Sequence, residues 1–208
     1  MSADRVTPGP RAAAAPGAGD PLVIVNPLSG ERITIREPAA GQAVLTWELE
    51  LAPGGRVPSS HAHPQQEERF TVLDGQMRFR VGRRRILAGP GDTVRIPPGT
   101  VHHFANASGR PARVAVRTTP ALSMQDLLET AAALAQGQDA AAGRIRRQIP
   151  SVASLALFMR DFEREVQAPY LPRPLVRVVA GTVAWLVTRL KLDRGYQRAK
   201  GAHAGGGQ

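Results

Sequence analysis

Residues 61–81 read HAHPQQEERFTVLDGQMRFRV, and the second half of this stretch has the pattern of a β-hairpin. At 77–81 apolar residues alternate with arginine, which is the period of a strand with one buried face. Asp74 and Gly75 stand between this run and the apolar run before it, and an Asp-Gly pair favours the tight turn of a hairpin. The stretch therefore predicts two antiparallel strands joined at this turn.

Similar short runs, separated by Gly and Pro, fill residues 21–119, and many short strands at regular spacing are typical of an all-β sandwich or barrel. After residue 120 the apolar spacing becomes helical, with Ser123 placed to cap the first helix and Gly137 placed to end it. We therefore expect a mainly β protein, with a barrel at 21–119 and a small α-helical extension at 120–200. The expected helices are 123–137, 151–167 and 175–192.

The two ends of the chain are poor in large apolar residues. Residues 1–20 are mostly Ala, Pro and Gly, and 201–208 are similar, so we expect both to be disordered tails. The first of them lacks the apolar core of a secretory signal. The longest uncharged apolar run, 178–188, is too short to cross a membrane, which needs about 20 residues. We expect a soluble, cytoplasmic protein.

Composition excludes several classes of site. The 208 residues include no cysteine, which rules out disulfide frameworks, thiolate metal sites and cysteine nucleophiles. Lys and Arg number 27 against 17 Asp and Glu, giving a formal net charge of +10. The one dense basic cluster is Arg83-Arg84-Arg85, so we do not expect a nucleic-acid partner.

Four of the five histidines lie in two short segments of the β-rich part. His61 and His63 are separated by one residue, so in an extended strand both rings project from one face. Beyond the break after His63, Glu68 shares a face with the apolar residues that follow, whereas Glu67 shares the other. We therefore expect Glu68 to be the inward carboxylate.

His102 follows the turn sequence Pro97-Pro98-Gly99 at the start of a strand, and its neighbour His103 must point the other way. Two or three imidazoles and one carboxylate that converge inside a barrel suit a borderline ion such as Mn, Fe, Co, Ni, Cu or Zn. Three nitrogens and one oxygen leave two positions of an octahedron open.

The joint spacing of these residues is more informative than any one of them. From Gly55 to Gly75 the sequence fits G-x5-HxH-x4-E-x6-G, and from Gly91 to Asn106 it fits G-x5-PxG-x2-H-x3-N. Both patterns resemble the signature motifs of the cupin family at every named position. The resemblance implies a small double-sheet β-barrel, or jelly roll, that holds one divalent transition metal ion. The implied ligands are His61, His63, Glu68 and His102.

Cupins catalyse varied reactions or none, so the family does not fix the function. Our leading hypothesis is a metal-dependent enzyme that oxygenates an aromatic or enol-type small molecule, with Glu68 as a ligand that can also act as a base. The alternatives are a non-catalytic binding or sensing module and a metal-dependent isomerase. Six residues are expected either to wall the pocket or simply to fill the core: Trp47, Phe70, Met77, Phe79, Ile96 and Phe104.

The predicted helix at 175–192 has a wide apolar stripe that includes Leu175, Val178, Val179, Leu186 and Leu190. We expect this stripe to pack on the barrel or in a homodimer interface. The alternative is a peripheral membrane helix, which an exposed tryptophan and flanking basic residues would favour.

Overall fold

The computed structural model describes residues 20–37, 43–57, 59–139, 144–147, 151–169 and 172–201. Residues 1–19 and 202–208, which make up almost all of the two predicted tails, lie outside the described residues. Gly201, the first residue of the second predicted tail, is the last residue of a helix.

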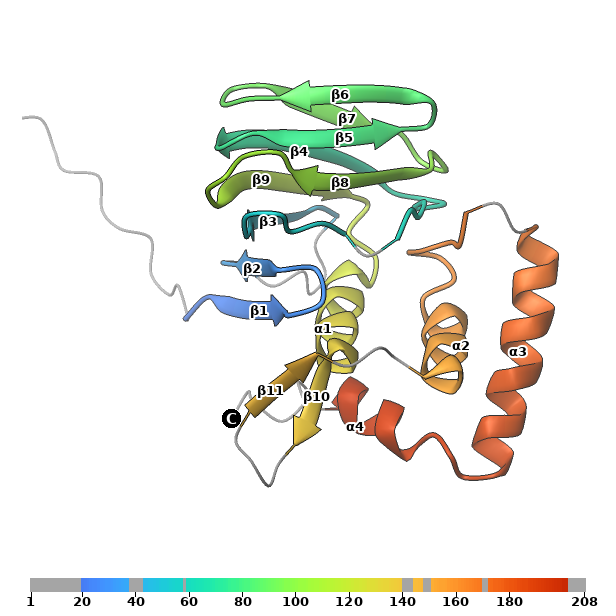
Figure 1. Cartoon of the computed structure of the whole chain (residues 1–208). Coiled ribbons are helices and arrows are strands. Elements are labelled where there is room, and N and C mark those ends of the chain that lie inside the picture. The colour runs from blue at the N-terminus through green and yellow to red at the C-terminus, as the bar shows by residue number, and fades with distance from the viewer. Residues whose placement is uncertain are drawn as a thin grey trace, which may run out of the picture.

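Nine strands form two antiparallel sheets (Figure 1). The larger has the order β1-β2-β3-β9-β4-β7 and the smaller has the order β6-β5-β8. The fold is thus mainly β, as expected, and has the two-sheet architecture of a jelly-roll barrel. The strands are β1 (Leu22–Asn26), β2 (Glu31–Ile35), β3 (Leu45–Leu51), β4 (Glu67–Asp74), β5 (Met77–Val81), β6 (Arg84–Ala88), β7 (Thr93–Ile96), β8 (His102–Asn106) and β9 (Ala112–Thr119).

The prediction of a hairpin at Asp74-Gly75 is wrong. β4 pairs with β7 and β9, whereas β5 pairs with β6 and β8, so the turn at Asp74-Gly75 carries the chain from one sheet to the other. Gly75 has φ +79°, and a Cβ there would lie 2.8 Å from the Cα of Ala112. The Asp-Gly pair therefore marks a tight turn, but it carries no information about which strands pair.

The barrel core lies between the two sheets and follows the alternation of the strands. Leu45, Trp47, Leu49 and Leu51 of β3 are buried, while the residues between them are more exposed. The buried residues of both sheets belong to one hydrophobic core, and burial of large apolar groups of this kind contributes about 1.5–3 kcal/mol each.

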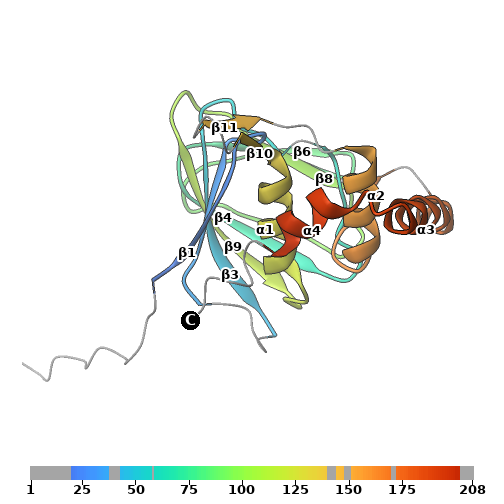
Figure 2. The same ribbon diagram turned by 90° about the horizontal axis from the view of Figure 1, so that it is seen from below.

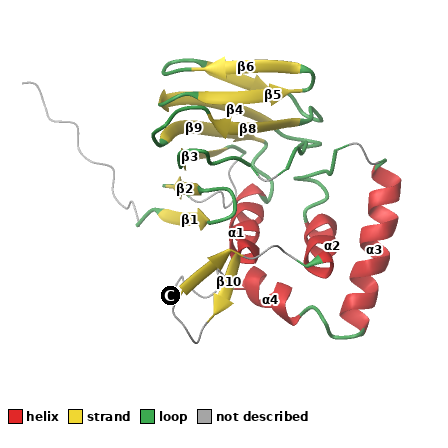
Figure 3. Ribbon diagram, in the orientation of Figure 1, coloured by secondary structure: helices red, strands yellow, loops and turns green. Residues whose placement is uncertain are grey.

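Helices follow the strands and are segregated from them (Figure 3). The elements are α1 (Met124–Ala135), β10 (Gln136–Asp139), β11 (Arg144–Arg147), α2 (Val152–Asp161), α3 (Arg173–Arg189) and α4 (Arg194–Gly201). The sequence did not predict α4 or the antiparallel ribbon of β10 and β11.

Two details of the expected helix ends differ from the structure. Ser123 precedes α1, but its side chain makes no capping hydrogen bond, and α1 ends at Ala135 because the chain enters β10 before Gly137. α2 ends at Asp161, six residues earlier than expected, and turns at residues 162–165. This early end allows the chain after α2 to return to the barrel.

The extension is divided between two cores. Met124 and Leu127 of α1, together with Phe162 after α2, belong to the barrel core. A second, smaller core includes Leu157 of α2 and Tyr196 of α4. Figure 2 shows the helices at one end of the barrel, with α3 on the outer side of α2.

The expectation that the stripe of α3 packs on the barrel is wrong. α3 packs on α2 through its opposite side, where Ala180 and Ala184 allow a close approach, and the large residues of the stripe are exposed. No helix among the described residues is both long and apolar enough to span a membrane. A homodimer, a cytoplasmic location and the lack of a nucleic-acid partner stay predictions.

Candidate metal centre

The segment that carries His61 and His63 is held along both of its edges. On one edge, the N–H of His61 donates to the carbonyl of His102 at 3.0 Å, and the N–H of His102 donates to the carbonyl of His61 at 2.8 Å. On the other edge, Ala62 and Gln167 exchange the same pair of bonds, at 3.2 and 2.8 Å. The helical extension therefore reaches the candidate site directly, as a short strand-like bridge after α2.

The turn before β8 fixes the third histidine. Gly99 has φ +73°, a conformation that L residues rarely adopt, and its N–H donates to the carbonyl of His63 at 2.8 Å. The Pro-Pro-Gly turn is thus bonded to the histidine segment, and His102 enters the site three residues later.

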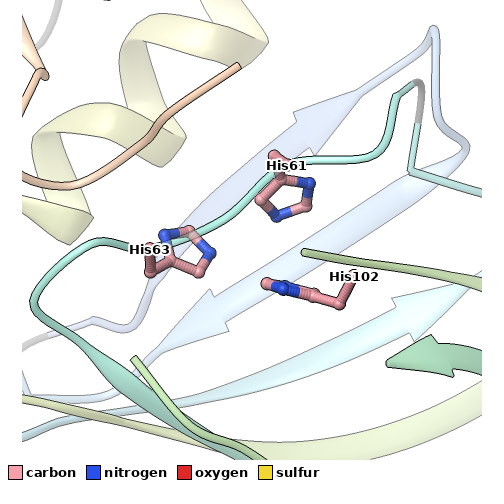
Figure 4. Close-up of side chains that lie close together, drawn as sticks. All are labelled: His61, His63 and His102. Carbon is pink, nitrogen blue, oxygen red and sulfur yellow. The ribbon is translucent and has the colours of Figure 1, made fainter. Parts of the chain in front are cut away.

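The imidazoles of His61, His63 and His102 form one cluster (Figure 4). One ring nitrogen from each lies within 4.8 Å of the others, so the three rings are close enough that they could hold a metal ion. His63 and His102 are 5% and 1% exposed, whereas His61 is partly exposed. The cluster is therefore buried on the barrel side and reaches solvent on the His61 side.

Each imidazole is oriented in the same way, by a backbone carbonyl that contacts its Nδ1. A carbonyl oxygen only accepts hydrogen bonds, so Nδ1 must carry the proton, and a neutral ring then has its lone pair on Nε2. Metal-binding histidines are commonly held in this manner. The pairs are His61 with Ser59 at 3.2 Å, His102 with Thr100 at 2.9 Å, and His63 with Glu165.

Glu68 of β4 brings a carboxylate to the same point. Its Oε2 lies 3.4 Å from Nε2 of His63 and 3.3 Å from Nε2 of His102. The residue is 3% exposed, whereas Glu67 lies on the outer face and pairs with Arg95. Nε2 of His102 is buried and has no hydrogen-bond partner within the described residues. A lone pair and a carboxylate that face each other repel unless a proton or a metal cation lies between them.

The electrostatics of the cluster favour such a cation. Burial, reinforced by His63 and His102, lowers the pKa of His61 to about 3, so this ring is neutral. Burial alone would raise the pKa of Glu68, but the charge of His63 and the contact with His102 outweigh it and hold this pKa below its usual value. Burial likewise opposes the charged form of His63, yet Glu68 raises its pKa overall. A proton on His63 can therefore neutralise the negative charge of Glu68. A divalent ion bound by all four side chains can neutralise the same charge.

The donor set fits a metal ion of the implied kind. Three imidazole nitrogens and one carboxylate oxygen are the ligands that borderline divalent ions prefer. His103 is not part of the set, because its Nδ1 lies 3.1 Å from the hydroxyl of Ser60, on the other face of the strand. The sequence did not indicate Glu165, since its carbonyl reaches His63 from 102 residues away and carries no side-chain signal.

The six residues considered as pocket walls are all buried members of the barrel core. Phe70 and Phe104 lie two residues beyond Glu68 and His102 on the same strands, and their rings contact each other and Phe79 with centroids 5.3–6.1 Å apart. These rings fill the barrel interior directly behind the cluster, which makes its inner side apolar.

The structure is an antiparallel two-sheet β-barrel with a three-histidine cluster between its strands. Within it, residues 47–117 match the family model of the cupin domain, from β3 to near the end of β9. This part of the chain is a cupin domain, as the spacing of the histidines and glycines predicts. It could hold a metal ion at the three histidines.

Solved structures similar to the chain include a sugar phosphate isomerase of a cupin superfamily from Silicibacter pomeroyi, with 26% identity over 43% of this chain and a TM-score of 0.40. The match spans only 59% of that protein. The protein TT1209 from Thermus thermophilus has 27% identity over 46% of this chain and 87% of its own, with a TM-score of 0.41. A predicted oxalate decarboxylase from Thermotoga maritima has 20% identity over 48% of this chain and 91% of its own, with a TM-score of 0.43. No curated protein matches the chain.

Proposed function

We propose that the cupin domain binds one divalent transition metal ion through the three histidines and Glu68. The observation that carries this proposal is the common orientation of the rings. All three Nδ1 atoms contact backbone carbonyls, so the Nε2 atoms are left as ligands. Among the described residues, the ion pairs of the Glu68 carboxylate are with His63 and His102, and no Lys or Arg neutralises it. Such a buried arrangement is costly without a cation.

We propose further that the site belongs to a metal-dependent enzyme of the dioxygenase type, acting on an aromatic or enol-type small molecule. A redox-active ion at this ligand set supplies Lewis acidity and one-electron chemistry toward dioxygen. The partly exposed side at His61 admits the ligand, and the phenyl rings behind the cluster exclude water and favour an apolar ligand. Glu68 is the candidate base, because its carboxylate is held in the ionised form and its Oε2 lies among the ring nitrogens of the cluster.

The metal content of the full chain, purified without chelators, tests the ligand assignment. We expect a near-stoichiometric metal in the unchanged protein and its loss in His61→Ala/His102→Ala. The matched control is His103→Ala, which removes a neighbouring histidine on the opposite face and should leave the metal in place. Equal loss in both variants would contradict the ligand set, and no metal under any supplementation would overturn the proposal.

Oxygen consumption distinguishes the reaction types. A protein loaded with Fe, Mn, Ni or Cu should consume oxygen with an aromatic or enol-type substrate, and His102→Ala should abolish this activity. Turnover that is independent of oxygen, with Zn or Mn bound, would indicate the isomerase alternative. Ligand binding without turnover would indicate a binding or sensing module.

A further inference from the structure

Helix α3 is apolar on two opposite sides. Ala180, Ala184 and Val187 on the inner side are buried, and the inner side packs on α2. The outer side also carries large apolar residues at helical spacing, and these are exposed. They are Leu175, Val178, Val179, Trp185, Leu186 and Leu190, with exposed fractions of 48–64%. We call this set the outer face of α3.

The outer face is too extensive to be an incidental exposure of single residues. It runs from Leu175 to Leu190 along the whole helix, and Leu192, which follows, is 66% exposed. A group of exposed large apolar residues of this extent marks a site of contact with another protein or with a membrane. Figures 1 and 2 agree that α3 lies at the edge of the molecule, so its outer face is accessible.

The charged residues of α3 itself are all basic, and Asp193 is an acidic residue among the basic residues that follow the helix. Residues 173–189 contain no Asp or Glu. Arg189, Lys191 and Arg194 are exposed at its C-terminal end, and they form no ion pair within the part of the chain that is described. Two such faces from two copies would bring like charges together, whereas an anionic surface would complement them.

We propose that the outer face of α3 binds the surface of an anionic lipid membrane, with the helix lying in the plane of the interface. The apolar side chains enter the boundary of the acyl chains, and the basic residues contact phosphate head groups. Trp185, 64% exposed on this face, is the residue type that favours the head-group level. With 17 residues α3 is about 25 Å long, and it is not among the helices able to span a membrane.

Vesicle binding by the full chain tests this proposal. Vesicles of phosphatidylcholine and phosphatidylglycerol should bind the protein and shift the fluorescence of Trp185 to the blue, while Trp47, already 5% exposed, should contribute little change. Binding should weaken as salt is raised, because the phosphate contacts are screened. Vesicles of phosphatidylcholine alone should bind more weakly.

Two pairs of substitutions make the test specific. Val178→Gln/Leu186→Gln should reduce partitioning into the anionic vesicles by about tenfold or more, because two inserted apolar groups are lost. The matched control is Leu73→Gln/Leu87→Gln, which changes two exposed apolar residues of the barrel strands and should bind like the unchanged protein. Arg189→Gln/Lys191→Gln should reduce both the binding and its salt dependence.

Three results would overturn the proposal. One is no binding to anionic vesicles at about 0.15 M salt. Another is equal loss of binding in the barrel control. The third is a dimer that forms with rising protein concentration in sedimentation experiments and is lost in Val178→Gln/Leu186→Gln, while vesicles do not bind. This result would assign the outer face to a second copy of the chain.

Discussion

The barrel and helix α3 bury their apolar side chains to very different degrees. Leu49, Phe70 and Met77 of the barrel strands are at most 1% exposed, whereas Val178 and Trp185 of α3 are each 64% exposed. The barrel therefore completes its own core, and α3 does not. The comparison teaches that internal packing accounts for the apolar residues of the barrel and for the inner side of α3, but not for the outer face of α3.

Replacing a central barrel residue should have the largest effect on stability. Phe70→Ala removes a ring that contacts Phe79 and Phe104 at centroid distances of 5.4 and 5.3 Å. We expect the free energy of unfolding to fall by about 3–5 kcal/mol, measured by urea denaturation followed by circular dichroism. Leu186→Ala on α3, as the counterpart, should change it by no more than about 0.5 kcal/mol. A comparable loss in both variants would show that α3 is buried in the free protein.

Metal binding should stabilise the barrel and leave α3 unchanged. At a metal concentration one hundred times Kd, mass action raises the free energy of unfolding by about 2.7 kcal/mol. Hydrogen exchange with and without Mn²⁺ should show slower exchange at β4, β8 and residues 61–63, and no change in α3. His102→Ala should remove the effect and His103→Ala should keep it. Protection that extends over α3 would mean that the two regions open as one unit.

The bridge between Ala62 and Gln167 is the point where the extension meets the candidate site. A single substitution can remove one of its two backbone hydrogen bonds. Gln167→Pro removes the N–H that donates to the Ala62 carbonyl at 2.8 Å. Because the same segment positions the Glu165 carbonyl on His63, we expect metal binding to weaken by about 10- to 100-fold, measured by competition with a chelator. Gln167→Ala, which keeps the N–H, should bind metal normally. Unchanged metal affinity in the proline variant would show that the extension does not help to form the metal site.

The sequence predicted the parts of this comparison that depend on local patterns. Alternation identified the strands and placed Glu68 inside and Glu67 outside, since the face of a residue in a strand follows from its neighbours. Alternation also placed His61 and His63 on one face, whereas the resemblance of both motifs to the cupin signatures implied that His102 joins them. The face that each residue takes in a strand is determined within a few residues of chain, but the meeting of the two histidine segments is not.

The features that the sequence did not predict depend on distant partners. The turn at Asp74-Gly75 has the pattern of a hairpin, but the strand before it, β4, pairs with β9, and the strand after it, β5, pairs with β8. The stripe of α3 gave no indication that α2 would take the opposite side of the helix. The carbonyl of Glu165 is a backbone group, so no side chain marks its role toward His63.

The smallest effect should come from the contacts that hold α4, the last described helix, on α2. Tyr196 is 1% exposed, and its hydroxyl donates to Oδ2 of Asp161 at 3.2 Å. Lys200 also donates to Oδ2, and Arg160 donates to Oδ1 of the same carboxylate. Tyr196→Phe should lower the free energy of unfolding by about 1 kcal/mol, measured by urea denaturation at pH 7.

Burial alone would raise the pKa of Asp161, but the hydrogen bonds from Lys200 and Arg160 outweigh it and lower this pKa. A lowered pKa in the folded state gives stability that is present above the unfolded value of about 3.9 and is lost as pH falls through the folded value. Hydrogen exchange in α4 should therefore become faster below about pH 4, while exchange in the barrel changes less. Asp161→Asn should remove this pH dependence. A pH response in the barrel but not in α4 would place the acid-sensitive contacts in the barrel.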